Sequence, residues 1–213
     1  MLKIEGKPIP EKITTTLLLI ILTIIYPHLG WTQSQEAPKA FQKFIVYKDK
    51  GSFNRFTMSG FMPSGKCEQM DDAWITDCHE GKSCIKAYFD RDCSILSGGD
   101  GWAGVYWLHP ANNWGDKKGS NLTGAAKLTF WAKGENGDEV LTFQMGGVGM
   151  RRDHPDTTNV KTELITLTKD WKQYSIDLKD RDLSNISGGF AWVGSAKQNQ
   201  QNITFYLDDI AYE

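Results

Sequence analysis

The spacing of apolar residues limits the fold of this chain more than any other feature of its sequence. Beyond residue 34, short runs of β-branched and aromatic residues recur between clusters of Gly, Asn and Asp, whereas long helical periodicity is missing. Many short strands of this kind predict an all-β fold, namely a two-sheet antiparallel β-sandwich of the jelly-roll type. The predicted strands are Phe44–Lys48, Phe53–Ser59, Ser83–Phe89, Gly101–Leu108, Ala126–Lys133, Glu139–Met145, Glu163–Thr168, Lys172–Leu178, Gly189–Gly194 and Ile203–Tyr212.

Alternation within these strands separates a core face from an exposed face. In KLTFWAK, Leu128, Phe130 and Ala132 share one face and are predicted to lie in the core, while Trp131 lies on the other face. The segments LTFQM and WKQYSIDL alternate in the same way. Strands with one apolar and one polar face are typical of sandwich sheets.

The closing run, ITFYLDDIAYE, departs from this alternation. The alternation of apolar residues shifts by one position between Leu207 and Ile210, and this shift predicts a β-bulge near Asp208 and Asp209. A bulge spreads two neighbouring carboxylates, and oxygen-rich turns of this sort suit calcium. The alternative is that the acidic pair caps the end of a strand at the surface.

The first residues predict export. Residues 14–26 (TTTLLLIILTIIY) form an apolar run that follows Lys3, Lys7 and Lys12 and precedes small and polar residues. The run is shorter than the ~20 residues that a spanning helix needs. We therefore predict a signal peptide over residues 1–34, with an uncleaved anchor as the alternative, and a single β-sandwich domain over residues 35–213. The expected location is secreted or periplasmic.

The cysteines support the same compartment. Thiols of exported proteins are normally oxidised, so two disulfides are expected, and the sequence leaves all three pairings open. A metal site made of Asp77, Cys78 and His79 is disfavoured because the chain has no C-x-x-C pair. The four cysteines are Cys67, Cys78, Cys84 and Cys93.

The charge of the chain narrows the class of partner. Its formal net charge is −2, and it has no long basic run. Nucleic acids and anionic membranes are bound by clustered Lys and Arg, so neither is an expected partner. A ligand that is uncharged or of mixed charge fits this chain better than a polyanion does.

Several segments together resemble a known family. They are VYKD at residues 46–49, GWAGVYWLHPANNWG at 101–115, LTGAAKLTFWAKGENGDE at 122–139, WKQYSIDL at 171–178 and ITFYLDDIAYE at 203–213. The set resembles the carbohydrate-binding modules of galactose-binding-like β-sandwich fold. The resemblance implies a jelly roll, non-catalytic binding of an oligo- or polysaccharide, and a structural calcium. Its ligands would be Asp208 or Asp209 from the last strand and Asp49 from the first. The four clustered cysteines depart from the family pattern.

Sugars present apolar C–H faces edged by hydroxyls, so a binding site needs flat rings beside polar groups. The stretch from Gly101 to Gly115 supplies both, and Trp114 lies in its loop, where aromatic residues commonly bind ligands. A second polar loop spans residues 146–158. The alternative for any single tryptophan is core packing. The predicted ligand-binding residues are Trp107, Trp114, Trp131, Trp192, His109, Asn112, Asn113, Asp116, Arg151 and Arg152.

Two other classes of protein remain open. A jelly-roll polysaccharide lyase or a glycoside hydrolase would use Arg151, His154, His109 or Asp116, but the strand motifs expected of a lyase are absent from the sequence. A secreted protein-interaction or adhesion domain could share the same fold, because a fold does not determine its function.

Overall fold

The computed structural model describes residues 40–96 and 101–213. The predicted signal peptide, residues 1–34, lies outside the described residues. The strands are β1 (Phe44–Tyr47), β2 (Thr57–Met62), β3 (Glu68–Trp74), β4 (Cys84–Phe89), β5 (Trp102–Leu108), β6 (Lys127–Gly134), β7 (Val140–Gly146), β8 (Asn159–Lys161), β9 (Ile165–Thr166), β10 (Lys172–Asp177), β11 (Gly188–Ser195) and β12 (Ile203–Tyr212), and a helix, α1 (Arg91–Leu96), follows β4.

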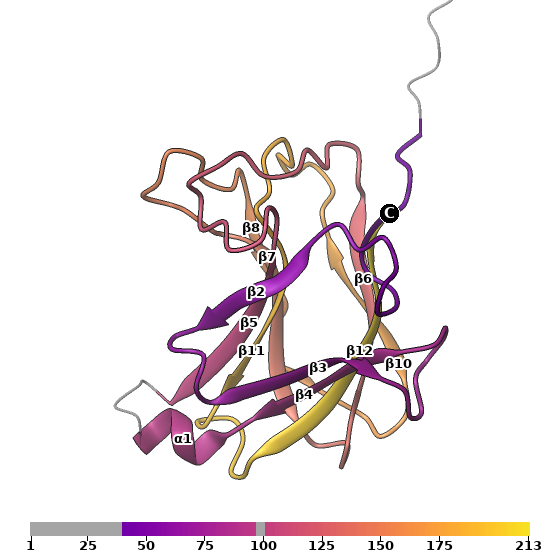
Figure 1. Ribbon diagram of the computed structural model, residues 1–213, viewed down its shortest axis with the longest axis vertical. Helices are drawn as coiled ribbons and strands as arrows, with labels where there is room; N and C mark the ends of the chain where they lie inside the picture. Colours follow the sequence, from indigo (N-terminus) through magenta and orange to yellow (C-terminus); the bar gives the residue numbers. More distant parts are fainter. Residues whose placement is uncertain (1–39, 97–100) are drawn as a thin grey trace, which may run out of the picture. The chain divides into compact units, whose positions relative to one another are not determined.

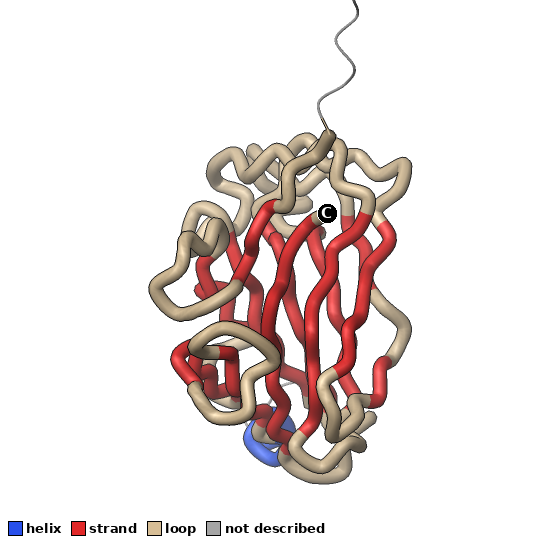
Figure 2. The backbone as a smooth tube through the Cα atoms, turned by 90° about the vertical axis from the view of Figure 1, so that its right-hand side faces the viewer, coloured by secondary structure: helices blue, strands red, loops and turns tan. Residues whose placement is uncertain are grey.

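The strands form two antiparallel sheets, as the sequence predicts (Figure 1). Sheet A has the order β10-β6-β12-β4-β3, and β1 pairs with β12. Sheet B has the order β2-β5-β11-β7-β8, and β9 pairs with β7. Figure 2 shows α1 at one end of the strands and long loops at the other. In the part of the chain that is described, no helix is long and apolar enough to cross a membrane.

All ten predicted strands exist, although two of them differ in extent. The second begins at Thr57 rather than Phe53, whose side chain is 78% exposed, and the strand predicted over residues 163–168 is reduced to Ile165–Thr166. The apolar pattern of the sequence does not predict β3, β8 or the helix α1. Strand β3 reads EQMDDAW, and most of its residues are exposed or half-buried, so its polar composition hides it from an apolar pattern.

The core lies between the two sheets and is rich in aromatic rings. Phe130 of β6 packs against Phe143 of β7, with ring centroids 4.5 Å apart, and against Phe190 of β11 at 5.1 Å. Leu128 and Ala132 are fully buried beside Phe130, which confirms the predicted core face of β6. The alternation of the sequence is therefore the direct cause of the sandwich.

The predicted bulge in the last strand is confirmed. The register between β12 and β6 shifts between Asp208 and Ala211, and Asp209 has a φ of 45°. This left-handed conformation is one that Asp and Asn adopt more readily than other side chains. The bulge keeps Leu207 and Ile210 both in the core despite their odd spacing, because one extra residue is absorbed between them.

Two disulfides are present, as predicted, and the structure determines their pairing. Cys67, which precedes β3, is joined to Cys93 in α1, and Cys78 is joined to Cys84 across the loop between β3 and β4. Cys78 is therefore unavailable as a thiolate ligand, which removes the metal site of Asp77, Cys78 and His79 considered above.

Candidate functional site

Two of the predicted binding tryptophans lie in the core, and the prediction was wrong for both. Trp107 is 2% exposed and Trp192 is 0% exposed. Trp107 packs edge-on against Phe190, and Trp192 packs edge-on against Phe205 at 5.0 Å. Both rings point between the sheets, so neither can stack on a glycan.

Asn113 is also a structural residue rather than a ligand-binding one. Its side chain is buried, its amide donates to the His109 carbonyl at 3.1 Å, and its carbonyl oxygen accepts the backbone N–H of Gly115 at 3.2 Å. The same amide donates to Ser187 Oγ at 3.0 Å. These bonds shape the loop that follows β5, and they leave the Asn113 side chain enclosed by protein.

Trp131 lies on the other sheet, and the His109 ring packs in a different pocket from Trp114. Trp131 is on the outer face of sheet A, where the His79 ring stacks on it at 3.7 Å and an interplanar angle of 18°. His109 packs edge-on against Phe56 at 5.7 Å and borders a shallow pocket with Phe44 and Phe53. The structure therefore divides the predicted set between different surfaces.

The remaining predicted residues come together around Trp114. The loop that carries Trp114 packs against the loop after β7. Gly115 and Gly149 are so close that a Cβ on Gly115 would lie 2.6 Å from the Cα of Gly149. Asp116 and Arg152 form an exposed ion pair of 3.3 Å between the same two loops. Asn112, at a φ of 60°, is anchored by a hydrogen bond from its backbone N–H to Ser59 Oγ. Arg151 is exposed beside Arg152.

The Trp114 ring rests on the outer face of sheet B. It packs edge-on against Tyr106 of β5, with ring centroids 6.1 Å apart. Gly60 of β2 leaves room for it, since a Cβ there would lie 2.7 Å from Tyr106 Cβ and 3.1 Å from Trp114 Cζ2. Trp114 is thus half-buried against the apolar cluster of this face.

A further tryptophan on this face was missed by the sequence analysis. Trp102 begins β5, is half-buried, and points to the same side as Gly104 and Tyr106. Trp102 lies four positions before Tyr106 on the strand, a span of about 13 Å. Alternation in GWAGVYWL groups Trp102 with Tyr106, but it does not say which face of β5 is exposed. Because Trp107 is buried in the core, the opposite face of β5, which carries Trp102, is the outer one.

Small and apolar side chains form the surface between these rings. Gly104 pairs with Met62 of β2 on one side and with Val193 of β11 on the other. A Cβ at Gly104 would lie 2.5 Å from the Trp192 carbonyl oxygen, so the strands can only approach this closely with glycine there. A strip of small and apolar residues therefore runs from Trp102 toward Trp114, and Met62 and Val193 on it are half-buried. We call this strip the sheet B face.

Polar groups border the sheet B face. The Tyr106 hydroxyl donates to the Gly146 carbonyl at 2.8 Å and accepts a hydrogen bond from the Gln144 amide. Burial raises the pKa of Tyr106, so its hydroxyl stays protonated at neutral pH. Gln144 is half-buried and pairs across the sheet with Lys161, which is exposed.

A half-buried carboxylate holds the second loop onto the sheet. Asp156 accepts backbone N–H groups from Val148 at 3.1 Å, from Ser187 at 2.5 Å and from Gly188 at 3.1 Å. Burial raises the pKa of Asp156. This residue fixes the loop that carries Arg151 and Arg152 relative to β11.

The outer face of sheet A carries a second group of rings. Trp74 and Tyr206 lie 6.2 Å apart beside a pocket of ≈ 430 Å³. Their surfaces are already engaged, because Lys86 Nζ lies 4.1 Å from the Trp74 ring and the Tyr206 hydroxyl donates to Glu135 at 2.6 Å. Stacking a sugar here would displace these contacts.

The predicted calcium ligands do not form one group. The Asp49 carboxylate accepts the backbone N–H groups of Lys82 at 2.6 Å and Ser83 at 2.9 Å. Asp208 accepts those of His79 at 3.1 Å and Glu80 at 3.2 Å, and burial raises the pKa of Asp208 to about 6. Each of these two carboxylates therefore holds a different part of the loop between β3 and β4.

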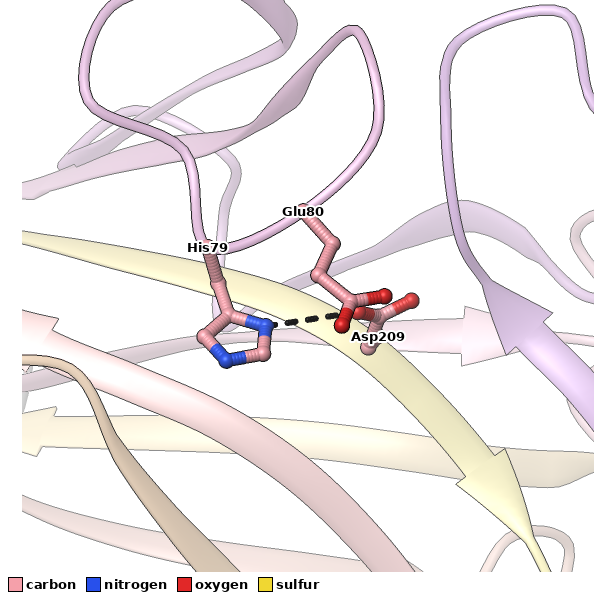
Figure 3. Close-up of side chains that lie close together, drawn as sticks. All are labelled: His79, Glu80 and Asp209. Carbon is pink, nitrogen blue, oxygen red and sulfur yellow. Dashed lines mark hydrogen bonds and ion pairs between the residues drawn. The ribbon is translucent and has the colours of Figure 1, made fainter.

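Asp209, the third predicted ligand, has different neighbours. Its carboxylate lies close to His79 and Glu80 (Figure 3). The donor atoms that come together therefore include a ring nitrogen, which calcium does not favour. The presence of calcium itself stays a prediction.

Comparison with known proteins identifies the family. The model of carbohydrate binding domain 30 matches residues 45–213. The crystal structure of a family 30 carbohydrate-binding module is similar, with a TM-score of 0.50 at 19% identity over 81% of this chain and 98% of that chain. A family 11 module from Clostridium thermocellum, in complex with a β-1,3-1,4-mixed-linked tetrasaccharide, has a TM-score of 0.53 at 14% identity over 81% and 96% of the two chains.

Another structure of a family 11 module, from a cellulosomal cellulase of Clostridium thermocellum, gives a TM-score of 0.51 at 16% identity over 81% of this chain and 95% of that chain. No curated protein sequence matches this chain. The resemblance to carbohydrate-binding modules of β-sandwich fold is confirmed. The chain therefore belongs to the carbohydrate binding domain 30 family, and its function is non-catalytic carbohydrate binding.

Proposed function

We propose that this chain binds a β-linked glucan along the sheet B face, between Trp102 and Trp114. One observation carries the proposal: the half-buried rings of Trp102 and Trp114 belong to the same face of one sheet, and the strip between them includes Gly104, which has no side chain. Indole rings stack on the C–H faces of sugars, and two such rings on one face suit an extended chain rather than a single sugar.

The bordering groups suit the hydroxyls of such a chain. Gln144 offers an amide beside the strip, while Asn112 and the ion pair of Asp116 with Arg152 lie on the loops around Trp114. Amide and charged groups can donate to or accept from sugar hydroxyls. The mixed-linked tetrasaccharide bound by the family 11 module supports a β-glucan as the first ligand to test.

The proposal is tested with a panel of polysaccharides. Affinity electrophoresis on mixed-linked β-glucan, xylan and mannan should retard the protein most strongly on the β-glucan, and calorimetry with the β-1,3-1,4-linked tetrasaccharide should give a saturable isotherm. The same mixtures should release neither reducing ends nor unsaturated products. Release of either product would favour the lyase or hydrolase, and a folded protein that binds no glycan would favour an interaction domain.

Removing the Trp114 side chain should weaken binding and also cost some stability. We expect Trp114→Ala to lower β-glucan affinity about 10-fold, which is about 1.4 kcal/mol. Its melting temperature should also fall by a few degrees, because the ring packs on Tyr106. Calorimetry and thermal melts on the same sample separate the two effects. Unchanged affinity per folded molecule would show that the ring only supports the loop.

The cell location is proposed on two grounds. The apolar run of residues 14–26 has the composition of a signal peptide. The disulfides Cys67–Cys93 and Cys78–Cys84 are expected of a chain that folds in an oxidising compartment. We infer that the domain is exported.

A further inference from the structure

Three side chains that commonly ligate metals lie on the side of sheet A, away from the proposed glycan site on sheet B. His79 and Glu80 belong to the loop between β3 and β4, and Asp209 belongs to the bulge of β12 (Figure 3). One ligand atom from each residue lies within 4.8 Å of the other two. The proposed glycan face uses none of these residues.

The loop that carries two of these residues is held in place from both ends. The disulfide between Cys78 and Cys84 closes it. The backbone N–H groups of His79 and Glu80 both donate to the Asp208 carboxylate. Because Asp208 directly precedes Asp209, the same strand positions all three candidate ligands.

The His79 ring is also oriented before any ligand binds. It stacks on Trp131 at 3.7 Å, and its Nδ1 lies 3.5 Å from Asp209 Oδ2. Zinc binds histidine nitrogen and carboxylate oxygen at about 2.0–2.2 Å, so two such ligands at tetrahedral angles lie about 3.4 Å apart. The observed separation of the two atoms is close to that value. Glu80, which is exposed, can swing its carboxylate toward the same point.

The carboxylates around this point have no lysine or arginine partner among the described residues. Glu80, Asp208 and Asp209 bring three carboxylates to one short region, and the side chains of His79 and Asp209 are only 19% and 17% exposed. A bound divalent cation would offset their mutual repulsion.

We propose that His79 Nδ1, Glu80 and Asp209 bind a first-row divalent transition ion of the zinc type. The set of one imidazole and two carboxylates matches the ligand preferences of such ions, whereas calcium prefers oxygen ligands alone. The three protein ligands leave a fourth position for water. Occupation of the site joins the loop between β3 and β4 to β12, so the ion stabilises sheet A.

Metal titration of the chelator-treated protein tests the proposal. We expect calorimetry to show one Zn²⁺ per chain, bound at least 10-fold more tightly than Ca²⁺, and Zn²⁺ to raise the melting temperature. His79→Phe retains a ring over Trp131 but removes the nitrogen ligand, and it should weaken Zn²⁺ binding at least 10-fold. His154→Phe, on a loop beside sheet B, is the matched control and should bind Zn²⁺ as the wild type does.

A second variant tests the same site in case His79→Phe does not fold. Asp209→Asn keeps a residue type that tolerates the positive φ while it removes the carboxylate, and it should also lose Zn²⁺ affinity. Zn²⁺ binding that neither variant weakens would overturn the proposal, as would a protein that binds no Zn²⁺. Ca²⁺ binding as tight as Zn²⁺ binding, unaffected by His79→Phe, would instead identify an oxygen-only calcium site. Glycan binding is measured separately on sheet B variants, so failure of either proposal leaves the other intact.

Discussion

We expect Trp102→Ala to lower the affinity for β-glucan by about 30- to 100-fold, or about 2–3 kcal/mol, and to leave the fold intact. The ring is half-buried at the first position of β5, so it can supply contact area to a ligand without filling the core. Its loss would remove one end of the proposed stacking strip, and the glycan would then be held by Trp114 alone. Calorimetry with the mixed-linked tetrasaccharide measures the effect.

Trp74→Ala is the matched control for this experiment. Trp74 is also a half-buried tryptophan at the end of a strand, but it lies on sheet A, where Lys86 covers its ring. We expect its glycan affinity to equal that of the wild type. If Trp74→Ala abolished binding and Trp102→Ala did not, the glycan site would have to be moved to the pocket beside Tyr206.

Trp192→Ala destabilises the domain by about 3–5 kcal/mol, the cost of removing a large aromatic side chain from a packed core. The ring is 0% exposed and lies between Val105 and Phe143 on the neighbouring strands. Urea unfolding followed by far-UV circular dichroism gives the free energy of unfolding directly.

Trp192→Phe separates the loss of packing from the loss of a polar group. The Trp192 Nε1 atom is buried without a hydrogen-bond partner among the described residues, so phenylalanine removes an unsatisfied donor and keeps most of the ring. We expect a much smaller loss of stability than for alanine, and normal glycan binding by the folded fraction. A Trp192→Ala protein of wild-type stability that no longer bound glycan would place this ring in the ligand site after all.

The contrast between Trp102 and Trp107 shows where sequence reasoning stops. Both belong to the run GWAGVYWL, and alternation correctly places them on opposite faces of one strand. Each face carries a ring, so the pattern is symmetric and does not identify the core side. The choice depends on which side meets Phe190 of the neighbouring strand, a contact between residues far apart in the chain.

The acidic residues of the last strand show the same limit. The phase change in ITFYLDDIAYE predicts the bulge, because the positions of Leu207 and Ile210 follow from local geometry alone. The neighbours of Asp209 do not follow from it. His79 lies 130 residues before Asp209 in the chain, and Glu80 follows it directly. Both lie close to Asp209 in the structure because they belong to the loop closed by Cys78 and Cys84.

The sequence by itself determined the all-β class, the strands with apolar alternation, the bulge and the number of disulfides, since each of these depends on residues close together in the chain or on compartment chemistry. Only the tertiary structure decided the disulfide pairing, the burial of Trp107 and Trp192, and the grouping of Trp102 with Trp114. These features depend on how sheets A and B pack on each other. Packing of this kind involves partners distant in sequence, which no local pattern encodes.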